Sequence, residues 1–307
     1  MTECDPIQLA IFSHRFMSIA EQMGRALQRT SISVNIKERL DFSCALFDAR
    51  GHLVANAPHI PVHLGAIGET VRGLLARCDL RPGDAWLSND PYGGGSHLPD
   101  LTVVSPVFRD GQLAFLVANR GHHADVGGLR AGSMPPDSTR IEQEGALFRD
   151  VLLLRDGRLR EDGVLATLRA AGARGLDERL GDLRAQVACN VAGARLLHAL
   201  CDQEGTETVQ RWMAAVEDNA AAVMADVVAG LRGGVFEDGL DDGSRIRVSV
   251  TVEDGRAVGV AFTQKGREQE VRAGREVLLS AGSIGSPVLS SVMSVIRAPC
   301  FFEMSIA

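Results

Sequence analysis

Two short segments on either side of Asp110-Gly111 most constrain how this chain of 307 residues can fold. Residues 101–108 and 113–118 are too short and too rich in strand-forming side chains for a helix of ordinary length. Asp-Gly is a favoured two-residue turn between antiparallel strands. We therefore predict a β-hairpin. Because a hairpin returns its ends to the same edge of a sheet, the residues just before 101 and just after 118 must lie side by side.

The two segments that this hairpin brings together are polar and rich in glycine. Residues 86–100 and 119–128 contain three histidines and three aspartates, which are Asp90, His97, Asp100, His122, His123 and Asp125. Imidazole and carboxylate groups are ligands of Zn²⁺, Mn²⁺ and Fe²⁺. We therefore predict a site for one divalent metal ion, of unassigned identity, at this edge of the sheet.

A purely structural role for these residues is the alternative. Aspartate before proline and aspartate beside glycine are ordinary turn residues, and a single loop histidine is more often a surface or core residue than a ligand. The doublet His122-His123 followed by Asp125 is harder to explain in this way, because buried imidazoles and carboxylates are costly without partners. The cluster as a whole therefore favours a metal site.

Two further histidines lie in the proline-rich segment 57–65. Pro58 and Pro61 disfavour a helix there, and in an extended segment His59 and His63 would point to the same side. They are either metal ligands or a buried pair bonded to the backbone.

The remaining periodicity predicts an α+β fold, in which antiparallel hairpins form the metal-site core and pack against long amphipathic helices. A second hairpin is predicted over residues 43–55 and a strand at residues 85–87. Helices are predicted near residues 6–27, 67–78, 158–171, 176–200 and 207–231, and strands at 245–252 and 257–262. A composition shift near Gly233 predicts two domains, the metal-site core over 1–233 and the start of a β-rich domain over 234–307.

Composition narrows the class of protein. A hydrophobic content of 45% with 23% charged residues is typical of soluble globular proteins, and a net charge of -7 argues against nucleic-acid binding. The chain has no 18-residue apolar run and no secretion signal, and its six cysteines lack metal-site spacing, so a cytoplasmic protein with reduced thiols is expected. It also lacks the phosphate-loop, dinucleotide-fold and Gly-x-Ser-x-Gly motifs.

The chain resembles the hydantoinase B family, known also as the second half of 5-oxoprolinases. The resemblance covers residues 5 to 250 and rests on several motifs in the expected order. These are Glu38-Arg-Leu-Asp-Phe-Ser43, Ala57-Pro-His-Ile-Pro-Val-His-Leu-Gly65, Ser88-Asn-Asp-Pro-Tyr-Gly-Gly-Gly-Ser-His-Leu-Pro-Asp100, Arg120-Gly-His-His-Ala-Asp-Val-Gly-Gly128, Ser133-Met-Pro-Pro-Asp-Ser-Thr139 and Glu142-Gln-Glu-Gly145.

This resemblance implies an ATP-dependent hydrolase that opens five-membered cyclic amides such as 5-oxoproline or hydantoins. A separate A-type subunit, or a fused half, would bind ATP, so a hetero-oligomer is expected. The resemblance also implies a metal held by Asp90, His122 and Asp125, with His59, His63, His97, Asp100 and His123 in or around the coordination sphere. His123 or His97 would relay a proton to the leaving nitrogen.

Two other functions remain open at this point. Related B-type subunits belong to ketone carboxylases, and a non-catalytic truncated remnant is the third possibility. The chain is shorter than members of the family, and Gly274–Pro287 is similar to a segment of flavin-dependent alcohol oxidoreductases. The flavin fingerprint is missing, so a truncated or fused chain without flavin is expected.

Overall fold

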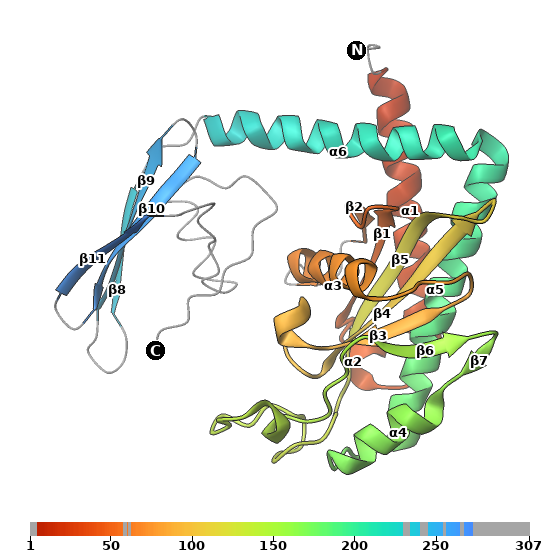
Figure 1. The fold of residues 1–307 in the computed structure, drawn as a ribbon, viewed down its shortest axis with the longest axis horizontal. Coiled ribbons are helices and arrows are strands. Elements are labelled where there is room, and N and C mark those ends of the chain that lie inside the picture. The colour runs from red at the N-terminus through yellow and green to blue at the C-terminus, as the bar shows by residue number, and fades with distance from the viewer. Residues whose placement is uncertain are drawn as a thin grey trace. The chain divides into compact units, whose positions relative to one another are not determined.

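The computed structural model describes residues 5–57, 60, 63–229, 234–239, 245–253, 256–264 and 267–272. The chain divides into two compact units, Met1–Glu217 and Asp218–Ala307. The strands of the first unit are β1 (Phe42–Asp48), β2 (Leu53–Asn56), β3 (Ala85–Ser88), β4 (Asp100–Arg109), β5 (Gln112–His122), β6 (Val151–Arg155) and β7 (Arg158–Leu159). They form one antiparallel sheet in the order β2-β1-β5-β4-β3-β6-β7 (Figure 1). The predicted α+β class is confirmed.

The central pair β4–β5 is the predicted hairpin. Asp110 and Gly111 form its turn with φ of 51° and 80°, the left-handed conformation that both central residues of a tight hairpin turn adopt. The pairing places Asp100 opposite His122 and Thr102 opposite Arg120. The two polar segments therefore do meet at one edge of the sheet.

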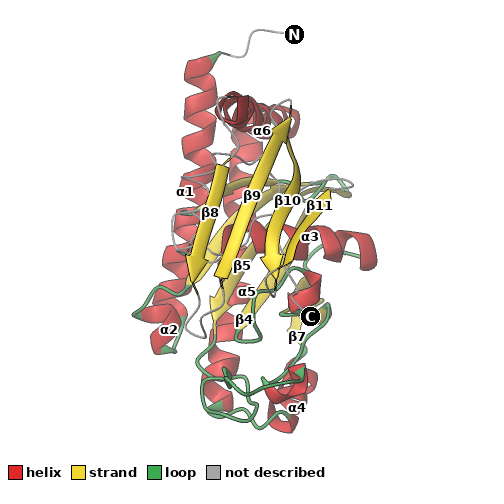
Figure 2. Cartoon of the chain, turned by 90° about the vertical axis from the view of Figure 1, so that its left-hand side faces the viewer, coloured by secondary structure: helices red, strands yellow, loops and turns green. Residues whose placement is uncertain are grey.

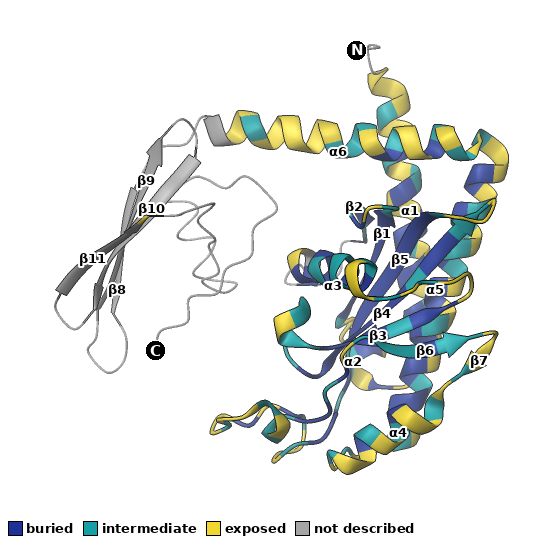
Figure 3. Ribbon diagram, in the orientation of Figure 1, coloured by how far each residue is buried: buried dark blue, intermediate teal, exposed yellow. Residues whose placement is uncertain are grey.

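Helices cover both faces of this sheet (Figure 1). On one face, α3 (His63–Arg77) packs Ile67, Val71 and Leu74 against β1, β4 and β5. On the other, α1 (Pro6–Thr30) and α5 (Leu176–Glu204) pack against each other and against the strands. The central strands are buried on both sides, as Figure 3 shows. Buried strand residues therefore face either α3 or the α1–α5 layer, alternating along each strand.

The rest of the first unit completes this frame. A short helix, α2 (Val34–Lys37), joins α1 to β1, and the 3₁₀ turns η1 (Pro91–Gly93) and η2 (Ile141–Gln143) lie in the loops after β3 and β5. Helix α4 (Glu161–Ala170) packs on α5, and α6 (Thr206–Ala229), which follows α5, contains the boundary between the two units. Asp5 caps α1 by accepting a hydrogen bond from the Ile7 N–H, with Pro6 at the first helical position.

Two local predictions require correction. The helix predicted from residue 67 begins at His63, so His63 occupies the first turn of α3 rather than an extended segment. The prolines that exclude a helix precede it, and proline is compatible with a helix start. Residues 158–159 form β7, and the helix predicted from 158 begins at Glu161.

The second unit contains the four strands β8 (Gly234–Gly239), β9 (Arg245–Glu253), β10 (Arg256–Gln264) and β11 (Arg267–Arg272). They form an antiparallel sheet in the order β11-β10-β9-β8 (Figure 2). Strands were expected in this part of the chain, whereas the domain boundary at residue 233 stays a prediction. None of the helices among the described residues combines the length and the apolarity that crossing a membrane requires.

Gly111 tests the hairpin turn. We expect Gly111→Ala to lower the free energy of unfolding by about 1–2 kcal/mol, because an L side chain is strained at a φ of 80° although no neighbouring atom lies within 4 Å. The control is Gly163→Ala in the exposed part of α4, where the added methyl group also meets no atom within 4 Å. That variant should gain about 1 kcal/mol, because alanine favours a helix. Denaturant unfolding measures both, and equal effects would contradict the turn geometry.

Candidate metal centre

The alternation of side chains along β4 and β5 builds a polar patch on the α3 face of the sheet. Asp100 and Thr102 on β4 lie opposite His122 and Arg120 on β5 and share their face, because residues two apart point the same way. Farther along this face the side chains are apolar and pack on α3. The polar patch therefore lies at one end of the buried layer.

Three side chains of this patch form a compact cluster. His122 Nδ1 lies 3.0 Å from Asp100 Oδ1 and 3.0 Å from His97 Nε2, and His97 Nδ1 lies 3.3 Å from Asp100 Oδ2. His97 comes from the loop before β4, and Ser96 of the same loop donates a hydrogen bond to Asp100 Oδ2. One donor atom from each of His97, Asp100 and His122 can be chosen so that all lie within 4.8 Å of one another.

A fourth member of the cluster is His63, whose ring orientation is fixed by Ser43. Ser43 Oγ donates to the Ile60 carbonyl at 3.2 Å and lies 3.1 Å from His63 Nδ1. A hydroxyl has one proton, so Nδ1–H of His63 must donate to Ser43 for both contacts to hold. In the neutral imidazole the Nε2 lone pair then faces Asp100 Oδ2, 3.4 Å away. A lone pair that faces a carboxylate is repelled by it unless a proton or a cation lies between them.

Asp41 completes the cluster at the start of β1. Its carboxylate oxygens lie 4.0 Å from His63 Nε2 and 4.0 Å from His122 Nδ1, and its carbonyl accepts the backbone N–H of His122 at 3.0 Å. The preceding residue, Leu40, has a φ of 56°, a conformation that a leucine rarely adopts. Such local strain is found where the surrounding structure fixes a functional residue.

Their electrostatic surroundings shift the pKa values of His122 and His97 in opposite directions. Burial raises the pKa of the Asp100 carboxyl, but the hydrogen bond from His122 and the adjacent imidazoles of His63 and His97 outweigh it and hold that pKa well below its usual range. Burial lowers the pKa of His122, but the hydrogen bond to Asp100 raises it more. Burial lowers the pKa of His97, and Asp100 offsets this only in part. At neutral pH Asp100 is therefore a carboxylate and His97 a neutral imidazole.

Solvent reaches the cluster from one side. Asp100 and His63 are buried, whereas the side chains of His97 and Asp41 retain 34% and 33% of their exposure. The wholly buried Arg120 lies behind them on the sheet. Burial lowers the pKa of Arg120 to about 10 while Asp100 opposes that shift, so the guanidinium stays charged at pH 7.

The donor set fits a divalent metal ion. Ligand atoms that share an ion at about 2.0–2.2 Å lie about 3–3.5 Å apart, which matches the separations around Asp100. Imidazoles combined with carboxylates suit zinc, manganese or iron. The Nε2 lone pair of His63, held by Ser43 behind it, has the orientation that a hydrogen-bonded metal-ligating histidine requires.

The structure does not bring the other predicted site residues into this cluster. His123 follows His122 and points to the opposite face, where it is buried against Gln186 Oε1 at 3.0 Å. Burial there lowers the pKa of His123 to about 4. Asp125 accepts hydrogen bonds from the Arg174 side chain and the backbone N–H groups of Gly127 and Gly132.

Asp90 also has a structural environment of its own. It caps η1 through the Tyr92 N–H and forms an ion pair with Arg149 at 2.8 Å. His59 lies outside the described residues. Metal binding by Asp90, Asp125 and His59 stays a prediction.

The glycines at 93–95 belong to a tightly packed loop, in which the N–H groups of Gly93 and Gly95 donate to the Asp90 carbonyl at 3.0 and 2.8 Å. A Cβ at Gly94 would lie 2.3 Å from the Thr70 nitrogen. Glycine is required here because the loop packs directly on α3.

Sequence reasoning missed Asp41 and Ser43, although both lie in the segment Glu38–Ser43. The parity of a strand beginning there puts 41 and 43 on one face, but only the pairing of β1 with β5 shows that this is the face of His122.

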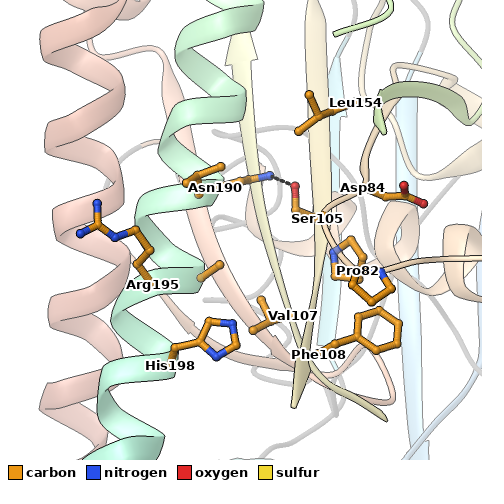
Figure 4. Close-up of a pocket in the computed structure, with 13 residues that line it drawn as sticks. Pro82, Asp84, Ser105, Val107, Phe108, Leu154, Asn190, Arg195 and His198 are labelled. Carbon is orange, nitrogen blue, oxygen red and sulfur yellow. Dashed lines mark hydrogen bonds between the residues drawn. The ribbon is translucent and has the colours of Figure 1, made fainter. Parts of the chain in front are cut away.

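A separate cleft of about 280 Å³ lies between α5 and the edge of β4 (Figure 4). Its walls are mostly apolar, and its polar groups include Ser105, which is bonded to Asn190, and His198. Ser105 is on the α5 side of the sheet, so the cleft is separate from the cluster on the α3 side.

The chain is similar to known proteins in sequence and in fold. The family model described as hydantoinase B/oxoprolinase matches residues 5–282. The chain is 48% identical to 5-oxoprolinase 1 of Arabidopsis thaliana over 81% of this chain and 20% of that protein. It is 31% identical to the caprolactamase subunit beta of Pseudomonas jessenii over 82% of this chain and 45% of that subunit.

Two solved structures share the fold. The crystal structure of the ATP-dependent caprolactamase from Pseudomonas jessenii matches with a TM-score of 0.72 at 30% identity, covering 84% of this chain and 46% of that one. A nucleotide-free acetone carboxylase matches with a TM-score of 0.71 at 16% identity, covering 82% and 36%. The chain thus spans about a fifth of the length of the plant 5-oxoprolinase and under half of the caprolactamase subunit.

The adjacent histidines provide a matched test of the metal centre. We expect His122→Gln to lose most of the bound divalent ion, because it removes a donor from the cluster. His123→Gln should retain it, because His123 faces α5. Elemental analysis after dialysis, with circular dichroism as the folding control, measures both. Equal metal content in the two variants would contradict the assignment.

The pH dependence of stability tests the Asp100–His122 pair. In metal-free protein, a raised pKa of His122 stabilises the fold fully below its unfolded value of 6.5, and this contribution is lost as the pH rises through the folded pKa. The difference in unfolding free energy between wild type and His122→Gln should therefore shrink as the pH rises from 6.5. With metal present the same rise should stabilise the wild type, because the ion competes with protons. Parallel curves for the two proteins without metal would contradict the pairing.

Proposed function

The chain belongs to the hydantoinase B/oxoprolinase family, and we propose that it supplies the metal centre of an ATP-dependent hydrolase that opens cyclic amides. The observation that carries the proposal is the convergence of His63, His97, Asp100 and His122. Three segments that are distant in the sequence, around residues 63, 97–100 and 122, place their donor atoms around one point that opens to solvent.

The residues present divide the work of such a site. A divalent ion held by His63, Asp100 and His122, with His97 left free beside it, would act as a Lewis acid, lowering the pKa of a coordinated water and polarising a carbonyl. Asp100, ionised and buried, lies 3.0 Å from His122 Nδ1 and 3.4 Å from His63 Nε2, so the three side chains would share the ion as ligands. Ser43 fixes the ring of His63.

His97 is the residue suited to moving a proton. Its imidazole is neutral at pH 7 because burial lowers its pKa, and it is the most accessible histidine of the cluster. A neutral imidazole can accept a proton from water and return it to the leaving nitrogen of a ring-opened amide. His123 is wholly buried on the other face, so we assign the proton relay to His97 alone.

ATP would be used on a partner. No phosphate loop or dinucleotide fingerprint occurs in this sequence, whereas one solved relative is an ATP-dependent caprolactamase. We therefore propose a hetero-oligomer in which an A-type subunit binds ATP and activates the amide. The ring is then hydrolysed beside the cluster of this chain.

Hydrolysis of a cyclic amide is favoured over carboxylation of a ketone by the relatives themselves. The relatives named for 5-oxoproline or caprolactam are 30–48% identical to the chain. Identity to the acetone carboxylase is 16%, which supports a shared fold and no more.

Reconstitution tests this function. The full chain, loaded with Mn²⁺ or Zn²⁺, is combined with an A-type subunit of the family and given ATP with 5-oxoproline, hydantoin or caprolactam. We expect release of ADP together with the ring-opened acid, detected by mass spectrometry. His122→Gln should abolish both products while His123→Gln retains them, and the chain without its partner should hydrolyse no ATP.

Two outcomes would overturn the proposal. Carboxylation of acetone with bicarbonate, without opening of any cyclic amide, would assign the chain to the ketone carboxylases. A wild-type complex that binds metal and ATP but converts none of these substrates would favour a non-catalytic subunit.

A further inference from the structure

Arg120 is a buried cation whose hydrogen bonds go to neutral acceptors on three different segments. Its Nε donates to Thr102 Oγ1 at 2.8 Å, and its Nη2 donates to Thr70 Oγ1 at 3.2 Å and to the Gly94 carbonyl at 2.8 Å. A buried guanidinium usually pairs with a carboxylate, and even the half-buried Arg155 pairs with the buried Asp84. The planar guanidinium of Arg120 instead joins three segments of the chain through its hydrogen bonds.

Each contact of Arg120 lies a short distance along the chain from a member of the cluster. Thr102 is two residues after Asp100 on β4, and Arg120 itself is two residues before His122 on β5. Gly94 precedes Ser96 and His97 in the same loop. Thr70 lies two helical turns after His63 in α3, on the same side of the helix.

The packing around these contacts leaves little freedom. The Gly94 backbone rests against the Thr70 backbone so closely that no side chain fits between them, and Gly95 rests equally closely on Asn89 and Asp90. The loop can therefore move away from α3 but not closer to it. The hydrogen bond from Arg120 to the Gly94 carbonyl opposes that movement.

We propose that Arg120 is a positioning residue that holds the metal ligands His63, Asp100 and His122, and the loop of His97 beside them, at the spacing the metal site requires. This inference rests on the proposed function. Its physical basis is that one rigid side chain with several N–H donors bridges β5, β4, α3 and the loop of His97. A lysine retains the charge, but its flexible ammonium cannot reproduce the planar fork.

The first test compares two buried arginines. Arg120→Lys should weaken the binding of Mn²⁺ to the full chain by about 10- to 100-fold, the usual effect of removing a residue that orients metal ligands. The control is Arg179→Lys, which alters a similarly buried arginine bonded to Glu178 and the Arg174 carbonyl, away from the cluster. Titration calorimetry should show wild-type affinity for that variant. Equal affinities of Arg120→Lys and wild type would overturn the proposal.

A milder pair of substitutions keeps the test valid if Arg120→Lys does not fold. Thr70→Val and Thr102→Val each preserve side-chain volume and remove one acceptor of Arg120 while leaving the arginine in place. Weaker Mn²⁺ binding in the double variant than in either single variant would support the proposal. Wild-type affinity in all three would refute it.

Hydrogen exchange separates this inference from the proposed function. In metal-free protein the amides of residues 95–98 should exchange faster in Arg120→Lys, or in the double threonine variant, than in Arg179→Lys. If wild type binds no metal, the proposed function fails and this comparison alone decides the role of Arg120. Unchanged exchange in this loop would then reject that role.

Discussion

The pairing of Asp100 with His122 across β4 and β5 is the constraint on which the site depends. It joins a buried carboxylate to an imidazole on the same face of the sheet, and it also fixes the register of the longest hairpin. One step inward on the same face, Thr102 and Arg120 meet, and beyond them the face is apolar and covered by α3. A single register therefore sets both the core contacts and the positions of the donors. The hydrophobic layer holds the strands in place, and the polar end of that layer becomes the site.

Burying a carboxylate and several imidazoles is unfavourable, and contacts among these groups offset that cost. Burial alone would protonate Asp100, yet His122 and His63 keep it ionised, and Ser43 orients His63 by accepting its Nδ1–H. Arg120 adds a positive charge behind the carboxylate without forming a hydrogen bond to it among the contacts described. Some imidazole lone pairs and carboxylate oxygens still face one another and repel. A divalent ion bound between them would remove this repulsion.

Much of the fold could be predicted from sequence because its signals are local. Asp110-Gly111 predicts the turn, and the spacing of Phe12, Phe16 and Met23 predicts the buried side of α1. The site was predicted only in outline. The hairpin predicts that the segments around 97–100 and 122 converge. The prediction did not take into account that His122 and His123 are adjacent in a strand and must therefore face opposite sides of the sheet. The role of Asp41 depends on the pairing of β1 with β5, and the roles of Asp90 and Asp125 depend on Arg149 and Arg174. Those are contacts between distant segments, and no local pattern encodes them.

The two-residue turn at Asp110-Gly111 has a consequence for how this chain can diverge. Substitutions there change stability by small amounts, whereas insertion of one residue within β5 would reverse the facing of every side chain beyond it. Gly121 would then take the place of His122, and Asn119 the place of Arg120. Insertion of two residues would restore the facing but displace each side chain along the strand. The face on which each side chain of β5 lies therefore depends on the number of residues that precede it in the strand. Length changes between residues 112 and 122 should be the rarest variation among functional homologues.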